Sequence, residues 1–91
     1  MKAFEVYLNG KHLVTAGIRH NNGILYSLTE MHFGGMLSYM LWGNDLTTKE
    51  RVEWALPDVK AGDEITVKIV ETDRISPEHR RWQWDTSERK S

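Results

Sequence analysis

The sequence predicts an all-β fold, mainly antiparallel, arranged as a compact sandwich or a partly open barrel of about six strands. Apolar and polar residues alternate with the period of a half-buried strand in several segments, and short turns rich in Gly, Asn and Asp separate them. The second faces of these segments are not cleanly polar, which two packed sheets or a dimer would require. A chain of 91 residues is too short for two independent cores.

The first two strands are predicted to form a hairpin. Alternation runs through residues 3–8, and the Asn-Gly pair at 9–10 tolerates the positive φ angles of a type I′ turn. The second strand then covers 11–18. A two-residue turn fixes the register, so that Val6 should face Leu13. The expected core face consists of Phe4, Val6, Leu8 and Leu13.

The next segment, 24–33, changes its apolar phase near its end. Ile24, Tyr26 and Leu28 lie on one face, whereas Met31 and Phe33 belong to the opposite face. This change predicts a strand with a bulge near residues 29–30. Residues 27–30 also fit a helix capping box, so a short helix is the alternative.

Residues 36–42 fit either a strand or one face of a helix. Glycines bound the run on both sides and seven residues make a poor helix, so we expect a strand, followed by a loop over 43–48. Alternation at Val52, Trp54 and Leu56 predicts another strand that Pro57 ends.

A Gly-Asp turn at 62–63 leads into the last clear strand, in which Ile65, Val67 and Ile69 are expected to point into the core. Ser76, Pro77 and Glu78 then fit the first turn of a short C-terminal helix. The organisation predicted is a β domain over residues 1–75, with a tail or short helix over 76–91 that packs on it or extends from it.

Charge and composition exclude several classes of protein. Twelve basic and 13 acidic side chains give a net charge of −1, so no strong field attracts nucleic acid. The absence of cysteine excludes disulfides and thiolate metal sites. Residues 1–10 show no signal peptide, and the longest near-apolar run, 36–42, cannot span a bilayer. We therefore expect a cytoplasmic protein without a membrane contact.

Three segments together resemble a group of short bacterial β-rich proteins to which no activity is assigned. They are residues 6–11 with 16–18, residues 31–35, and residues 62–67. The resemblance covers most of residues 4–72 and implies a bacterial all-β protein. It supplies no functional residues.

Catalytic and metal-binding patterns are weak. Glu30 and His32 would share a strand face and could bind a metal together with His12 or His20, but a polar strand edge is the simpler explanation. The chain has neither a Gly-x-Ser-x-Gly elbow nor a phosphate loop. We expect a non-catalytic protein with no metal and no cofactor.

The tryptophans give the best candidate site. Trp54 is expected in the core, whereas Trp42 borders a glycine loop. Trp82 and Trp84 lie in the basic tail beside two arginines, and large rigid aromatic side chains next to arginine are typical of contact surfaces. The candidate binding residues are Trp42, Arg80, Arg81, Trp82 and Trp84. The alternative is that the tail only covers an open edge of the fold.

The predicted function is therefore protein binding, as an inhibitor, an immunity-type partner or an assembly subunit. The partner would be another protein or a second copy of the chain. The alternative is a small-ligand or carbohydrate binder that uses a tryptophan platform. Arginine and tryptophan also alternate in single-strand nucleic-acid surfaces, but Glu78, Asp85 and Glu88 would repel the phosphate backbone.

Overall fold

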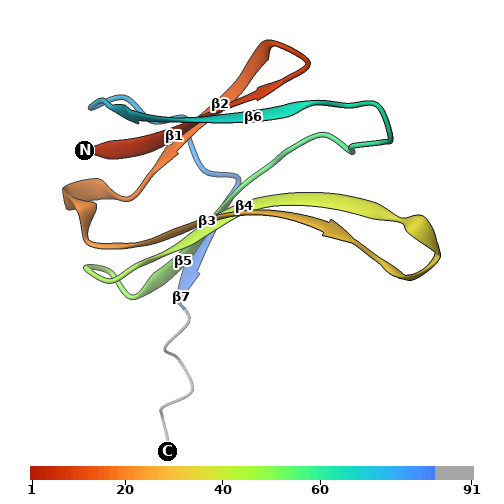
Figure 1. Cartoon of the computed structure of the whole chain (residues 1–91). Coiled ribbons are helices and arrows are strands. Elements are labelled where there is room, and N and C mark those ends of the chain that lie inside the picture. Colours follow the sequence, from red (N-terminus) through yellow and green to blue (C-terminus); the bar gives the residue numbers. More distant parts are fainter. Residues whose placement is uncertain (84–91) are drawn as a thin grey trace, which may run out of the picture.

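The computed structural model describes residues 1–83, which form two antiparallel sheets packed face to face as a sandwich (Figure 1). The three-stranded sheet has the order β2-β1-β6, with β1 at Lys2–Leu8, β2 at Lys11–Gly17 and β6 at Ile65–Glu71. The four-stranded sheet has the order β3-β4-β5-β7, with strands at Gly23–Met31, Leu37–Asp45, Glu50–Trp54 and Arg80–Gln83. Single 3-10 turns occur at Arg19–Asn21 and Phe33–Gly35. The predicted all-β class is confirmed.

The hydrophobic core lies between the two sheets. Val6 of β1, Leu41 of β4 and Val52 of β5 are fully buried there. Trp54 is also buried, as predicted, and its Nε1 donates a hydrogen bond of 2.9 Å to the Ser76 carbonyl oxygen. None of the helical turns in residues 1–83 is long and apolar enough to cross a membrane.

The predicted N-terminal hairpin is present, with Asn9 and Gly10 at φ angles of 52° and 82°. Leu8 pairs with Lys11 as predicted, but a bulge between Val6 and Tyr7 then shifts the register by one residue. Val6 consequently pairs with Val14 instead of Leu13. The extra residue places Val14 and Ala16 on the core side of β2, and Leu13, predicted there, also packs against the core.

Strands β3 and β4 form a long hairpin without interruption. Their register is continuous from the pair Gly23–Asp45 to the pair Met31–Leu37, so the predicted bulge and the alternative helix at 27–30 are both wrong. The strand predicted at 36–42 is confirmed, but it continues to Asp45 into the expected loop. Met31 and Phe33, the apolar residues that break the alternation, are exposed at the hairpin tip and do not belong to the core.

Strand β6 lies at an edge, and this position overturns part of the predicted core. Its inward residues pair with those of β1, since Val67 lies opposite Val6 and Ile69 opposite Phe4. Val67 and Ile69 are nevertheless 38% and 73% exposed. Their direction was predicted correctly, but no strand of the four-stranded sheet covers this part of the inner face.

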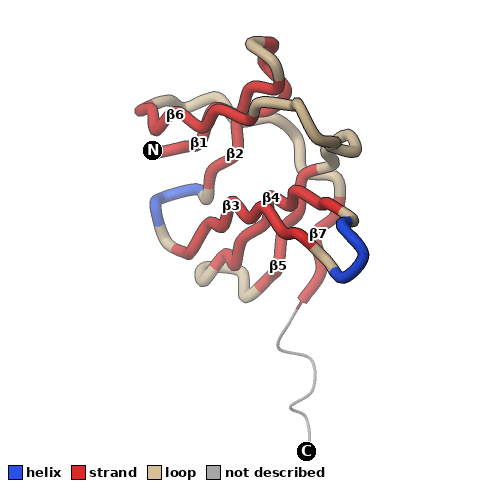
Figure 2. Tube along the Cα trace, turned by 45° about the vertical axis from the view of Figure 1, so that its right-hand side comes forward, coloured by secondary structure: helices blue, strands red, loops and turns tan. Residues whose placement is uncertain are grey.

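The helix predicted after Pro77 is also absent. The Ser76 N–H donates to the Thr15 carbonyl oxygen at 2.7 Å, and the Thr15 N–H donates to Ser76 Oγ at 2.9 Å. Through these two hydrogen bonds Ser76 covers the free edge of β2, and it does not cap a helix. The chain then crosses to the other sheet, where β7 pairs with β5 (Figure 2). Residues 80–83 are thus a strand of the β domain.

Candidate functional site

The candidate site is the outer face of the four-stranded sheet, the side turned away from the core. Along β4, Tyr39, Leu41 and Gly43 are buried, so the alternate residues point outward. Cross-strand pairing brings Tyr26 of β3 beside Trp42. It likewise sets Arg51 of β5 opposite Trp82 of β7, so one row of side chains crosses all four strands.

This row, which we call the aromatic row, consists of Tyr26, Trp42, Arg51, Trp82 and Arg80. The rings of Tyr26 and Trp42 are stacked, with centroids 4.2 Å apart. The Arg51 guanidinium lies 3.7 Å from the centroid of Trp42 and 5.6 Å from that of Trp82. Arg80 follows at 4.4 Å from Trp82. Aromatic rings and cations therefore alternate, an arrangement that stabilises each pair by about 0.5–2 kcal/mol.

One carboxylate accompanies the two guanidinium groups of the row. Glu53 lies 3.4 Å from Arg51 and 4.0 Å from Arg80. The Arg80 side chain keeps 59% of its surface exposed, whereas that of Arg51 keeps 30%. Arg80 is thus the cation of the row that solvent or a partner reaches most readily.

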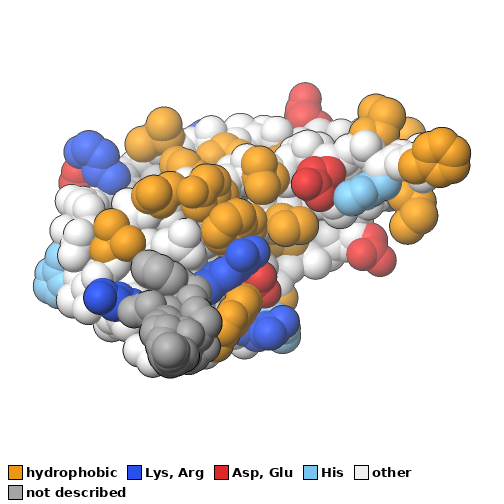
Figure 3. Space-filling model, turned by 90° about the horizontal axis from the view of Figure 1, so that it is seen from below, with side chains coloured by type: hydrophobic (Ala, Val, Ile, Leu, Met, Phe, Trp, Pro, Cys, Tyr) orange, Lys and Arg blue, Asp and Glu red, His pale blue; other side chains and the backbone are white. Residues whose placement is uncertain are grey.

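An apolar area continues the row on β3 and β4. Ile24 and Leu28 flank Tyr26 on the same side of β3 and are 48% and 37% exposed. Met40 points outward beside Leu28 on β4. Figure 3 looks onto this side of the molecule and shows hydrophobic side chains gathered along it, with Lys and Arg side chains beside them. Isolated exposed apolar residues are ordinary, whereas contiguous groups are more common at interaction surfaces.

The structure brings three of the five predicted binding residues together. Trp42, Arg80 and Trp82 all belong to the aromatic row. Arg81 points to the other side of the sheet, because it pairs with the buried Val52. Trp84 lies outside the described residues.

Arg81 serves a different purpose from the one expected. Its guanidinium contacts Glu50 at 2.6 Å, Glu78 at 2.9 Å and the buried Asp45 at 3.4 Å, and thus ties β7 to the turn between β4 and β5. Burial would lower the pKa of Arg81, but its hydrogen bonds to Glu50 and Glu78 outweigh burial and raise that pKa. The hydrogen bond from Arg81 in turn lowers the pKa of Glu50.

Sequence reasoning missed Tyr26 and Arg51 as members of the site. Their residue types carry no signal, since Tyr26 sits in an ordinary alternating strand and Arg51 precedes a core valine. The signal is the strand pairing, which places Tyr26 next to Trp42 and Arg51 next to Trp82. A correct register for β3–β4 and a β7 strand would have been needed to find them.

The ring of Trp42 is enclosed. Tyr26 and Arg51 approach it from the two neighbouring strands, one on each side of β4. The Nε1 of Trp42 and the Nε of Arg51 are shielded from solvent, and neither finds a hydrogen-bond acceptor among the described residues. Unpaired buried donors cost about 1–3 kcal/mol each, so the packing of these two side chains offsets a local penalty.

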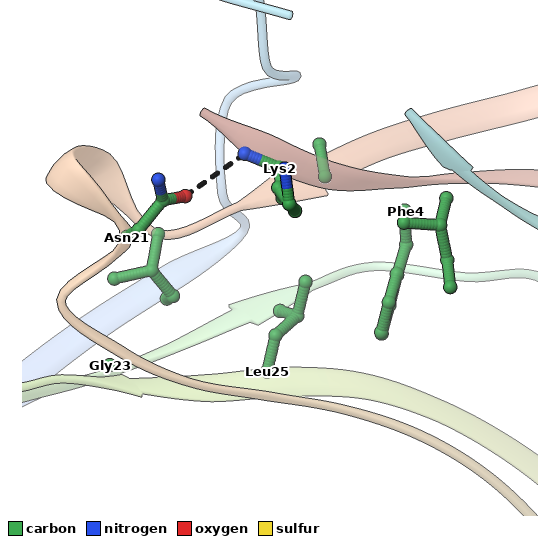
Figure 4. A pocket seen from close by; sticks show the side chains of 8 residues that line it. Lys2, Phe4, Asn21, Gly23 and Leu25 are labelled. Atoms are coloured by element: carbon green, nitrogen blue, oxygen red, sulfur yellow. Dashed lines mark hydrogen bonds between the residues drawn. The ribbon is translucent and has the colours of Figure 1, made fainter. Parts of the chain in front are cut away.

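A cavity lies elsewhere, between the sheets at their open side. It measures about 310 Å³, and Phe4, Asn21, Gly23 and Leu25 are among the residues that line it (Figure 4). The Lys2 N–H donates to Asn21 Oδ1 at 2.9 Å at the rim. The lining is mainly apolar and carries no carboxylate or imidazole.

The metal pair considered from the sequence is engaged in a local cluster. His32 lies 3.4 Å from Glu30 and 2.9 Å from Ser38 Oγ on the β3–β4 hairpin. Among residues 1–83, no three His, Cys, Asp or Glu side chains converge as a metal site would require. His12 instead contacts Thr15 Oγ1 at 2.9 Å on the other sheet.

No protein-family model, curated protein or solved structure matches this chain significantly.

Proposed function

We propose that this protein is a non-catalytic protein-binding module and that its contact surface is the outer face of the four-stranded sheet. The observation that carries the proposal is the aromatic row, in which Trp42 and Trp82 are held by Tyr26, Arg51 and Arg80 across four strands. A cytosolic location and a bacterial origin, both expected from the sequence, belong to the same proposal.

The composition of this face supports protein binding. Aromatic residues and arginine are enriched at the centres of protein interfaces, and truncation of such residues commonly costs 2 kcal/mol or more. The stacking between Tyr26, Trp42 and Arg51 fixes these side chains before any partner arrives. Side chains that are already ordered lose little conformational entropy on association, which favours affinity.

The chemistry of the face also indicates what kind of partner it would bind. Ile24 and Leu28 would contact an apolar patch, because both are exposed and lie at the β3 side of the row. The exposed Arg80 guanidinium at the β7 side would pair with a carboxylate or a backbone carbonyl. The expected partner is a protein with an apolar patch next to an acidic one.

A carbohydrate platform is the competing function, and the geometry favours it less. A sugar stacks on an open aromatic face, whereas Tyr26 and Arg51 both pack against the ring of Trp42. Trp82 has guanidinium groups at 4.4 and 5.6 Å, which a sugar would have to displace. Titration with mono- and oligosaccharides should leave tryptophan fluorescence unchanged.

The proposal is tested by affinity capture from cells that contain this protein, with two matched double variants. Arg80→Ala with Trp82→Ala removes a cation–aromatic pair from the outer face. Tyr7→Ala with Lys68→Ala removes a similar pair, at 5.0 Å, from the outer side of the three-stranded sheet. We expect the first variant to lose the captured protein and the second to retain it. Equal capture by both variants, with both folded, would contradict the proposal.

A further inference from the structure

Strand β3 is an edge strand, and the backbone groups that face its free edge can be identified. The Asn22 carbonyl oxygen accepts from the Leu46 N–H at 2.9 Å, and the His32 N–H donates to the Met36 carbonyl oxygen at 2.6 Å. The backbone of even-numbered residues therefore faces β4. Successive residues of a strand alternate in this respect, so the odd-numbered residues present their N–H and C=O groups at the free edge. They are Gly23, Leu25, Ser27, Thr29 and Met31.

Within residues 1–83, this edge lacks the features that usually prevent strand addition. Natural sheets protect their edges with prolines, bulges, charges or a covering segment. Strand β3 contains no proline, has an unbroken register with β4 and carries Glu30 as its single charge. By contrast, Ser76 covers the edge of β2 at Thr15, and β7 is four residues long with two arginines.

The inner face of β6 extends over the space beside this edge. Ile69 lines the 310 Å³ cavity together with Leu25 and Gly23 of β3, yet Ile69 remains 73% exposed. The cavity is therefore open on the β3 side of the sandwich, and Figure 4 shows Phe4 and Leu25 on its two walls. A further strand hydrogen-bonded to β3 would lie beneath the exposed apolar residues of β6.

We propose that this strand is β3 of a second copy of the chain, paired antiparallel about a twofold axis at Ser27 to form an eight-stranded sheet. Ser27 is the midpoint of the nine-residue strand Gly23–Met31. In this register Ser27 faces its own counterpart, Leu25 faces Thr29, and Gly23 faces Met31. All five residues whose backbone groups face the free edge then form hydrogen-bonded pairs with the second copy. No other register pairs all five. The twofold pairing makes the interface self-complementary.

The position of Met31 also favours a second copy of this chain as the partner. It is 78% exposed, and it shares the inward side of β3 with Leu25 and Ser27 because all three are odd-numbered. The proposed register sets Met31 opposite Gly23 of the second copy, which has no side chain to obstruct it. Gly23 and Leu25 line the cavity, so Met31 of each copy would enter the cavity of the other.

The remaining side chains are compatible with this pairing. Tyr26 would lie opposite Leu28 of the second copy, an aromatic–aliphatic cross-strand pair of the stabilising kind. The two Glu30 carboxylates would be six residues apart along the strands, about 20 Å, and would not repel each other appreciably. This interface uses the strand edge and the cavity, so it does not depend on the function proposed for the outer face.

The first test is the mass of the full-length protein in solution by sedimentation equilibrium. We expect a dimer of twice 10.6 kDa. Met31→Glu should weaken dimerisation at least tenfold, because the carboxylate would have to leave water for a mainly apolar cavity. Met36→Glu is the matched control, since Met36 lies at the same hairpin tip, is 69% exposed and stays outside the interface. A monomeric wild type, or equal effects of the two variants, would overturn the proposal.

The second test fixes the register. The chain has no cysteine, so Ser27→Cys introduces a single thiol at the axis. Opposed Cα atoms in a hydrogen-bonded antiparallel pair are about 5.5 Å apart, within the range that a disulfide spans. Mild oxidation should give a covalent dimer for Ser27→Cys and none for Lys11→Cys, which lies at the exposed start of β2. A dimer that Ser27→Cys does not cross-link would overturn this register.

Discussion

The guanidinium of Arg51 lies 3.7 Å from the centre of the Trp42 ring, on the side of β4 opposite Tyr26. This stack joins β3, β4 and β5 through side chains that point away from the core. It holds the outer face of the four-stranded sheet in one arrangement, and it explains why the outward-pointing Trp42 is partly buried.

Replacement of Arg51 tests the energetic value of the stack. Arg51→Ala should lower the free energy of unfolding by about 0.5–2 kcal/mol, because the cation–π contact with Trp42 is lost. Arg51→Lys should recover less than half of this loss, since an ammonium group cannot stack as a plane. Urea unfolding followed by tryptophan fluorescence measures both changes. Arg80→Ala, at the exposed end of the row, should lower stability by only about 0.5 kcal/mol, because an exposed cation–π contact is the weakest kind; a loss equal to that of Arg51→Ala would contradict this ranking.

Two substitutions of Trp42 separate the energetic contribution of its ring from that of its unpaired Nε1 donor. Trp42→Phe keeps an aromatic ring between Tyr26 and Arg51 but removes the Nε1 that lacks an acceptor. The lost area and the relieved penalty should nearly cancel, which leaves stability within about 1 kcal/mol of wild type. Trp42→Ala should instead cost about 3 kcal/mol or more. Similar destabilisation by both substitutions would show that the unpaired Nε1 carries no cost.

Substitutions at Ser76 and Pro77 distinguish a segment that covers the β2 edge from the start of a helix. Ser76→Ala removes the acceptor of the Thr15 N–H and should lower stability by about 0.5–1.5 kcal/mol. Pro77→Ala should have a smaller effect, because no helix begins at this position. Thermal melts of the two variants give the comparison. The reverse order of effects is the outcome that a helix after Pro77 would produce.

The Arg81 cluster predicts part of the acid sensitivity of the fold. Hydrogen bonding to Arg81 lowers the pKa of Glu50 below its ordinary value of 4.5. A lowered pKa means that the ionised carboxylate stabilises the fold above pH 4.5 and that this contribution is lost as the pH falls through the folded-state pKa. Glu50→Gln should therefore be less stable than wild type near neutral pH, and the difference should shrink in acid. Unfolding curves for the two proteins that remain parallel at every pH would contradict this role of Glu50.

The local features of the fold could be predicted from the sequence. Asn9 and Gly10 adopt the positive φ angles that an Asn-Gly turn requires, and Trp54 is buried as its alternating strand indicates. Such features depend on a few neighbouring residues, whose backbone preferences and periodicity are visible in the chain.

Features that depend on the position of a strand within its sheet could not be predicted. Ile69 alternates like a core residue but is exposed because β6 is an edge strand. Ser76 has the sequence of a helix cap but bonds to β2, a contact between residues 61 positions apart. The aromatic row likewise depends on the pairing of β5 with β7, which no local pattern specifies.

The most direct test of the proposed contact surface is site-specific photo-cross-linking in cells. A photoreactive amino acid at Ile24 would stand on the outer face of the four-stranded sheet, whereas the same residue at Thr66 would stand on the outer side of the three-stranded sheet. We predict one discrete adduct with a different protein from position 24, lost when Trp82→Ala and Arg80→Ala are added, and no such adduct from position 66. Equal cross-linking to another protein from both positions, or an adduct of position 24 with that other protein that survives the double substitution, would contradict the assignment of the outer face.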